Sequence, residues 1–110
     1  MLDIDQLNQK FLSYNHVVEC LLKYDEINAY YNLELILAVD LFKQSIPSLK
    51  IRFVNITNLE MRNFGNKFTQ FVDLHIEKNH DGWDDVKYNV FQIEEENISF
   101  KCLNVEEILD

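Results

Sequence analysis

The first apolar positions of the chain follow the spacing of one helix face. They are Leu2, Ile4, Leu7, Phe11 and Leu12. Asp3 or Asp5 can cap the start of such a helix, because a carboxylate accepts hydrogen bonds from the unpaired backbone N–H groups of the first turn. We therefore expect one short amphipathic helix over about residues 3–14.

From about residue 16 the apolar positions indicate strands instead. The β-branched and apolar run 17–24 predicts a first strand, although a second helix would also fit it. Residues 33–41 alternate between apolar and other positions, so we expect a strand with one fully apolar face. Pro47 separates this run from the next, at a place where a turn or a strand edge tolerates its missing N–H.

The alternation breaks once in the middle of the chain. Residues 49–53 alternate, residues 54–56 lose the phase, and the alternation resumes by Met61. A bulge or a tight turn near Asn55–Asn58 would restore the inward face. Residues 68–78 alternate again and predict another half-buried strand.

The last third of the chain predicts antiparallel hairpins. Asn79–Gly82 is a turn signal, because Asp-Gly favours the positive φ angles that join antiparallel strands. Residues 88–93 and 98–102 then predict a hairpin with an acidic tip. Residues 105–109 fit a closing strand and a last helical turn equally well.

Together these segments predict a mainly β (α+β) fold. One N-terminal helix precedes about six strands, which extend from about residue 16 to residue 108. The connections are too short for parallel crossovers, so we expect an antiparallel β-sandwich or roll. A length of 110 residues, 47% of them hydrophobic, predicts a single domain over residues 1–110.

Apolar content and charge narrow the class of protein. No apolar run reaches the ~18 residues that a membrane-spanning helix needs, and the acidic N-terminus lacks the basic start of a secretory signal. We expect a cytoplasmic protein. The chain has 10 Lys+Arg and 19 Asp+Glu, for a net charge of −9, which opposes binding to a phosphate backbone. Residues 77–110 hold 10 of the 19 acids and 3 of the 10 basic residues, so a charge-steered partner would be a basic protein.

The residues offer little for catalysis or for cofactors. With only two glycines, Gly65 and Gly82, the chain lacks a phosphate-cradling loop. Cys20 and Cys102 have no local catalytic signature and no metal-ligand spacing, and we expect reduced core thiols, with a disulfide left open if their strands are neighbours. We therefore expect neither catalytic residues nor a cofactor.

One polar cluster contains the residue types that could bind a divalent metal ion. Its members are His75, Glu77, His80, Asp81, Asp84 and Asp85. An EF-hand alignment on Gly82 fails, because Tyr88 falls where a bidentate Glu must stand. We expect a solvated turn here and no metal site.

Parts of the chain resemble a group of small uncharacterised bacterial proteins. The resemblance rests on Leu49-Lys-Ile-Arg-Phe-Val-Asn-Ile-Thr-Asn-Leu-Glu-Met61, Gly82-Trp-Asp-Asp-Val-Lys-Tyr-Asn-Val90 and Ile98-Ser-Phe-Lys-Cys102, with Asn15-His16 opening a strand. Some similar β-rich proteins are encoded beside secreted toxins and act as immunity proteins. The resemblance therefore implies a non-catalytic binding role.

The leading hypothesis is a protein-interaction domain that masks a basic toxin surface. The expected contact residues are Trp83, Asp84, Asp85, Glu94, Glu95 and Glu96. The alternative is a small-molecule binding domain or an enzyme, with a pocket between sheet and helix lined by Tyr14, His16 or Tyr24. An exposed strand edge could also pair two copies into a homodimer under either hypothesis.

Overall fold

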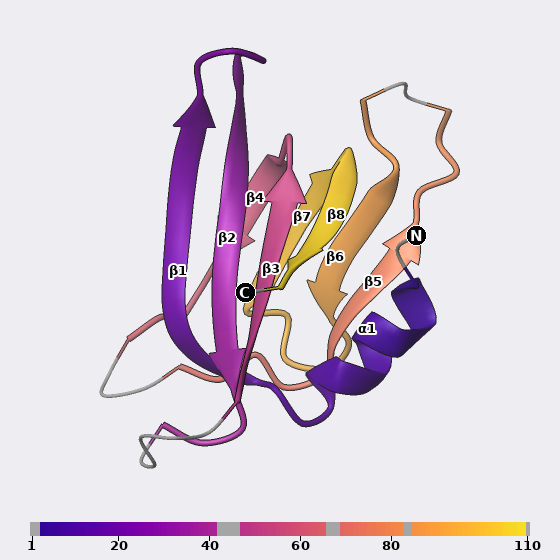
Figure 1. Ribbon diagram of the computed structural model, residues 1–110. Helices are drawn as coiled ribbons and strands as arrows, with labels where there is room; N and C mark the ends of the chain where they lie inside the picture. Colours follow the sequence, from indigo (N-terminus) through magenta and orange to yellow (C-terminus); the bar gives the residue numbers. More distant parts are fainter. Residues whose placement is uncertain (1–2, 42–46, 66–68, 83–84, 110) are drawn as a thin grey trace.

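One helix and eight strands make up the fold of the described residues (Figure 1). The computed structural model describes residues 3–41, 47–65, 69–82 and 85–109. The elements are α1 (Ile4–Phe11), β1 (His16–Asp25), β2 (Tyr30–Ala38), β3 (Ser48–Val54), β4 (Thr57–Met61), β5 (Leu74–Lys78), β6 (Tyr88–Gln92), β7 (Ile98–Cys102) and β8 (Asn104–Ile108). The predicted mainly β, antiparallel fold with an N-terminal helix is confirmed, with more strands than the six or so expected.

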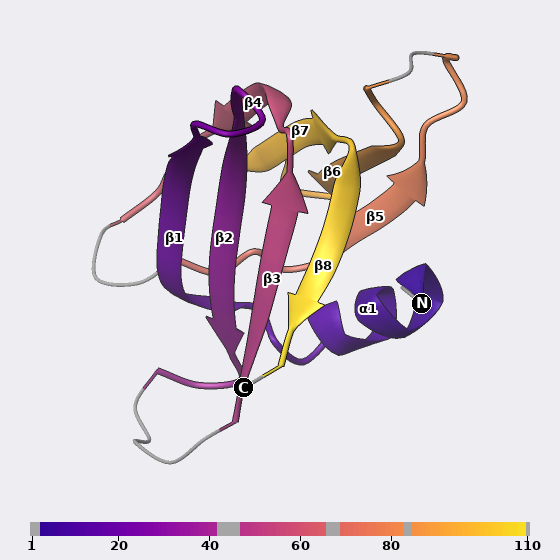
Figure 2. The same ribbon diagram turned by 45° about the horizontal axis from the view of Figure 1, so that its top comes forward.

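The strands form two four-stranded sheets. Sheet A has the order β1-β2-β3-β8, and sheet B has the order β4-β7-β6-β5. All strand pairs in both sheets are antiparallel. Figure 2 shows sheet A from its outer side, with sheet B behind it and α1 beside β5 and β8.

A bent two-stranded ribbon links the two sheets. β3 leads into β4 across residues 55–56, and β7 leads into β8 across Leu103, so β3 pairs with β8 in sheet A and β4 with β7 in sheet B. The Leu103 N–H donates to the Val54 carbonyl at 2.9 Å, which continues the pairing through the bend. Strands that change sheet at a bend are a known way to join packed sheets. The phase break at residues 54–56 is this bend.

Alternation along the strands builds one core between the sheets. In β2 the buried leucines are Leu33, Leu35 and Leu37, which all point inward. Across the interior the rings of Phe53 and Phe100 meet edge to face, with centroids 4.9 Å apart. Such a ring pair adds to the stability that its buried area already gives.

Helix α1 closes the open edge of sheet B. The Asp3 carboxylate accepts from the Gln6 N–H at 3.1 Å and caps the helix, while Leu7 and Phe11 are buried in the core. Asn8 donates to the Ile76 carbonyl at 2.9 Å and accepts from the Ile76 N–H at 2.8 Å. The Asn8 side chain therefore bonds the outward N–H and C=O groups of Ile76, as a neighbouring strand would.

The helix and one strand are shorter than predicted. α1 ends at Phe11, with Leu12 as its C-cap, instead of continuing to residue 14. The predicted strand 68–78 is regular only from Leu74, because Asp73 has a φ of 59° that breaks an extended conformation. Phe71 is nevertheless buried, and its N–H donates to the Asn15 carbonyl at 2.8 Å.

Two segments near the C-terminus differ from the prediction or were left undecided by the sequence. β5 and β6 are joined antiparallel, but through a connection over residues 79–87 that the Asn79 N–H closes on the Lys87 carbonyl at 2.8 Å. Gly82 has the expected positive φ, 79°. The C-terminal segment is a closing strand, β8. Among the described residues, no helix is long and apolar enough to cross a membrane.

Gln92 is a fully buried polar side chain at the end of β6. Its amide donates to the Val72 carbonyl at 2.8 Å, and its amide oxygen accepts from the Asn97 N–H at 2.9 Å. It therefore connects the segment before β5 with the turn after β6. A buried backbone group that loses its partner costs about 1–3 kcal/mol.

We expect Gln92→Ala to lower the free energy of unfolding by about 2–4 kcal/mol, because it leaves two backbone groups unpaired and opens a cavity. Gln9→Ala, at an exposed position of α1, is the matched control and should change stability by less than about 0.5 kcal/mol. Urea unfolding of the three proteins measures both effects. Equal stability of the two variants would show that the Gln92 bonds contribute nothing.

Candidate functional site

The outer face of sheet B presents two rows of side chains to solvent. Because directly paired residues point to the same face, the register defines each row. One row runs Thr57, Lys101, Asn89, Glu77, and the next runs Glu60, Ser99, Phe91, His75. The inward neighbours of these residues, such as Val90 and Phe100, are buried in the core.

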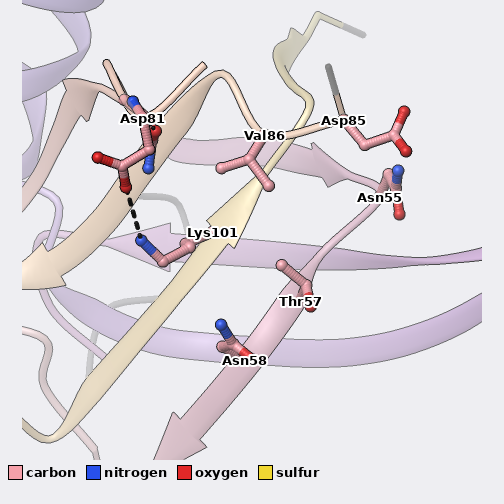
Figure 3. A pocket seen from close by; sticks show the side chains of 8 residues that line it. Asn55, Thr57, Asn58, Asp81, Asp85, Val86 and Lys101 are labelled. Carbon is pink, nitrogen blue, oxygen red and sulfur yellow. Dashed lines mark hydrogen bonds and ion pairs between the residues drawn. The ribbon is translucent and has the colours of Figure 1, made fainter. Parts of the chain in front are cut away.

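A polar groove lies at the end of this face where the ribbon bends (Figure 3). Its volume is about 540 Å³, and its walls come from the bend, the start of β4, the β5–β6 connection and β7. The lining residues are Asn55, Thr57, Asn58, Asn79, Asp81, Asp85, Val86 and Lys101. Among the described residues of this lining, Val86 is the single apolar one, so the groove suits hydrogen-bonding and charged groups.

Hydrogen bonds hold one wall of the groove in place. Asn79 donates to the Asn89 side chain at 2.7 Å and accepts from the Asp81 N–H at 2.8 Å. Lys101 donates to the Asn89 amide oxygen at 3.3 Å and lies 4.0 Å from an Asp81 carboxylate oxygen, the contact dashed in Figure 3. The Asp81 side chain is 69% exposed, so this ion pair leaves its carboxylate accessible to a partner.

The opposite wall has an unusual backbone. Asn55 and Asn58 both have a φ of 55°, in the left-handed region that asparagine tolerates better than most residues. The bulge between Thr57 and Glu60 accompanies them. Bulges turn side chains in new directions, and here they bring the Asn58 and Thr57 side chains to the groove.

The groove continues along the face as two smaller hollows. The first, of about 430 Å³, shares Asn58 and Lys101 with the groove. The second, of about 310 Å³, shares Glu60 and Ser99 with the first and extends to Arg62 and Glu96. The three depressions together form what we call the sheet B surface, which runs from the β5–β6 connection to the β6–β7 turn.

Acidic side chains outnumber basic ones on the sheet B surface. The acids that line its depressions are Glu60, Asp81, Asp85 and Glu96, against Lys101 and Arg62. Glu77, in the outward row beside the groove, adds a further acid. Arg62 lies 3.9 Å from Glu60, and Lys101 lies 4.0 Å from Asp81, so both basic residues already face an acid.

The outer face of sheet A is nearly balanced by comparison. Its register places Glu19, Asp25, Glu34 and Glu106 there with Lys23, Lys50 and Arg52. Arg52 also donates two hydrogen bonds to one Glu34 oxygen, at 3.0 and 2.9 Å. The negative field of the two sheets is therefore stronger on the sheet B side.

The structure divides the predicted contact residues between two places. Asp85 lines the groove, and Glu94, Glu95 and Glu96 are exposed in the turn after β6. β6 separates these two groups, so they lie at opposite ends of the sheet B surface instead of forming one cluster. Trp83 and Asp84 lie outside the described residues.

The sequence did not point to several residues of the groove. Asn55, Thr57, Asn58 and Lys101 carry no motif, and only the pairing of β4 with β7 brings them near the β5–β6 connection. The phase break at residues 54–56 was the available signal, since a bend with polar residues in a β-rich chain often lies at a surface site.

His75, one residue of the polar cluster considered for a metal ion, lies on the outward face of sheet B. His75 contacts the Phe91 ring, with centroids 5.7 Å apart, on the sheet B surface. Among the residues that the structure describes, no group of three or more His, Cys, Asp or Glu side chains is arranged to hold a metal ion.

The space between helix and sheet is not the pocket that the alternative hypothesis expects. An open groove of about 550 Å³ separates α1 from β8 and is crossed by the Lys10–Glu107 ion pair at 2.7 Å. Tyr14, His16 and Tyr24 do not line it. His16 and Tyr24 stand near opposite ends of β1, so they cannot share one pocket with Tyr14.

Both cysteines are free and poor nucleophiles. They lie in β1 and β7, in different sheets. Burial raises the pKa of the Cys20 thiol, and it raises the pKa of Cys102 to about 12. A raised pKa keeps the thiol protonated, which disfavours nucleophilic attack.

Comparison with known proteins identifies a family. Residues 1–106 match the family model described as Immunity protein PIM8. No curated protein and no solved structure matches the chain significantly.

The pKa of Cys102 predicts a pH dependence of stability. The folded state favours the neutral thiol, so its contribution is complete below the ordinary pKa of 9.0 and is lost as the pH rises toward about 12. Over that interval the wild type should lose up to about 1.4 kcal/mol per pH unit more than Cys102→Ala. Chemical unfolding at several pH values measures the slopes.

Val90→Ala is the matched control, because it removes buried volume from the same core without removing a thiol. It should lower stability at every pH and keep the wild-type slope. Identical alkaline slopes for Cys102→Ala and wild type would contradict the assignment.

Proposed function

The chain belongs to the immunity protein PIM8 family, and from this membership we propose that it neutralises a bacterial toxin by binding it on the sheet B surface. The family implies a protein toxin as the partner and suggests a non-enzymatic role. We propose that the protein acts in the cytoplasm as a stoichiometric inhibitor and that the bound toxin surface is basic.

The observation that carries this proposal is the uneven charge of the two outer faces. The acids of the sheet B surface exceed its basic residues by two to one or more, while the outer face of sheet A has four acids and three basic residues. Complementary charge accelerates association and disfavours partners of the wrong sign. A basic surface therefore meets a stronger attractive field at sheet B than at sheet A.

The shape and chemistry of the sheet B surface also support a protein partner. Three connected depressions extend along one strand direction, which suits an extended surface contact better than an enclosed small molecule. Asn55 and Asn58 offer side-chain amides, and Asp81 and Asp85 offer carboxylates, which together accept bonds from Lys, Arg and backbone N–H groups.

Toxin binding is tested with the protein encoded beside this chain's gene in its host. Production of that neighbour alone should stop the growth of a test bacterium, and co-production of this chain should restore it. If the protein encoded by the neighbouring gene is toxic and this chain does not inhibit it, the proposed role is contradicted.

The binding surface is tested by charge reversal at the groove. Asp81→Lys with Asp85→Lys should weaken binding of the purified neighbour by about 10- to 100-fold, mainly through slower association, and the loss should shrink as salt is raised. Surface plasmon resonance at low and moderate salt measures both rates.

Glu26→Lys with Glu106→Lys is the matched control. These acids are also exposed, the change in net charge is the same, and neither residue lies on the sheet B surface. Retained affinity in this control supports a local site. Equal weakening in both double variants would show that net charge alone steers the toxin.

A further inference from the structure

The long edge of sheet A differs from the other sheet edges. β1 has ten residues, whereas β4, β5 and β8 have five each. Asn8 covers the β5 edge, and the Lys10–Glu107 ion pair joins α1 to β8. Among the described residues, the backbone contacts on the outer side of β1 lie at its start, where His16 bridges to Gln70.

The free part of this edge is limited at both ends. At its start the Val17 N–H donates outward to the Thr69 carbonyl at 2.8 Å. At its end the Asp25 carboxylate accepts from the N–H groups of Ile27 and Asn28 and holds the turn to β2. The free stretch therefore runs from Val18 to Tyr24, and Leu21 is its midpoint.

The backbone direction of this stretch follows from β2. The Tyr31 carbonyl accepts from the Ile56 N–H, on the β3 side, so alternation turns Leu33 and Leu35 toward β3 as well. Their partners Leu22 and Cys20 therefore direct their own N–H and C=O groups away from β2. These groups are available to another strand.

The side chains of the free stretch are apolar for an exposed edge. Val18, Leu21, Leu22 and Tyr24 are between 40% and 54% exposed. Soluble proteins usually protect such edges with a lysine or a proline, and here Lys23 stands in the strand. A lysine in the middle of an edge opposes pairing unless an acid faces it.

The sequence of β1 supplies that acid when the strand pairs with its own copy. An antiparallel pair centred on Leu21 sets Glu19 of each chain opposite Lys23 of the other, and Val18 opposite Tyr24. A centre shifted by one residue, at Leu22, would set Glu19 opposite Asp25 instead. The charges therefore favour one register.

Charge also favours a second copy over a basic partner at this edge. Residues 18–24 carry one acid and one basic residue, so the segment is neutral in a chain of net charge −9. Two such segments can approach with little repulsion, and a basic toxin gains nothing from them.

We propose that the protein forms a symmetric homodimer through antiparallel pairing of β1 with β1, centred on Leu21. The pairing joins the two copies of sheet A into one continuous sheet. It leaves the sheet B surface of each copy uncovered, so dimerisation and toxin binding are separate properties.

Sedimentation equilibrium over a wide concentration range tests the dimer. The wild type should be dimeric at high concentration. Glu19→Lys and Lys23→Glu should each weaken dimerisation by roughly tenfold or more, because like charges then face each other twice. The double variant Glu19→Lys with Lys23→Glu should restore the wild-type dissociation constant.

Thermal unfolding of the same variants shows that each one is folded. Glu26→Lys, outside the paired segment, is the control and should not change the dissociation constant. A wild type that stays monomeric at millimolar concentration would overturn the proposal. A double variant that does not recover the wild-type dissociation constant would overturn the register.

Cross-linking tests the register directly. In a Cys20→Ser background, Leu21→Cys places two thiols opposite each other in a pair without backbone hydrogen bonds, where the Cα atoms are closest, ~4.5 Å apart. This variant should form an intermolecular disulfide rapidly under mild oxidation. Glu19→Cys in the same background faces Lys23 and should not, and equal rates for the two would contradict the arrangement.

Discussion

The backbone pairing through the bent ribbon is the constraint on which both sheets depend. The Leu103 N–H meets the Val54 carbonyl at 2.9 Å, and on either side of this bond the same two chain segments pair in different sheets. The bend sets the two inner faces against each other, so Phe53 and Phe100 can contact across the core. It also places Asn55, Thr57 and Lys101 at one corner, which is where the polar groove lies.

The strands were predictable because alternation of apolar and polar residues indicates a strand with one buried face. The leucines of residues 33–37 are inward and buried, and the phase break at residues 54–56 marks the bend. The short helix was also visible, because Leu7 and Phe11 lie one turn apart and Asp3 is a good cap.

Other features depend on contacts between distant residues and left little trace in the sequence. Residues 69–73 alternate, yet the positive φ of Asp73 and the bond from Phe71 to Asn15 draw them out of the sheet. From the sequence, residues 105–109 fitted a strand and a helical turn equally well, because β8 becomes a strand by pairing with β3. The candidate site was predictable only in its acids, since Asp85 and Glu96 were recognised by charge, and the asparagines of the opposite wall were not.

The two sheets have different surface chemistry, and this difference separates two roles. Sheet B carries excess acid over a hollowed polar face, which suits a basic protein. From Val18 to Tyr24 the edge of sheet A is neutral and apolar, and among the described residues no strand pairs with its outer side, which suits a matching strand. A molecule can hold a toxin on one face and a copy of itself at the other edge without competition between them.

The central claim is that the sheet B surface holds the toxin, and amide hydrogen exchange of the complex measures it most directly. Adding the protein encoded beside this chain's gene should slow exchange in residues 57–61, 79–82, 85–87 and 96–101 and leave residues 18–24 unchanged. Protection confined to β1, β2 or α1, with no change across β4 and β7, would contradict the account.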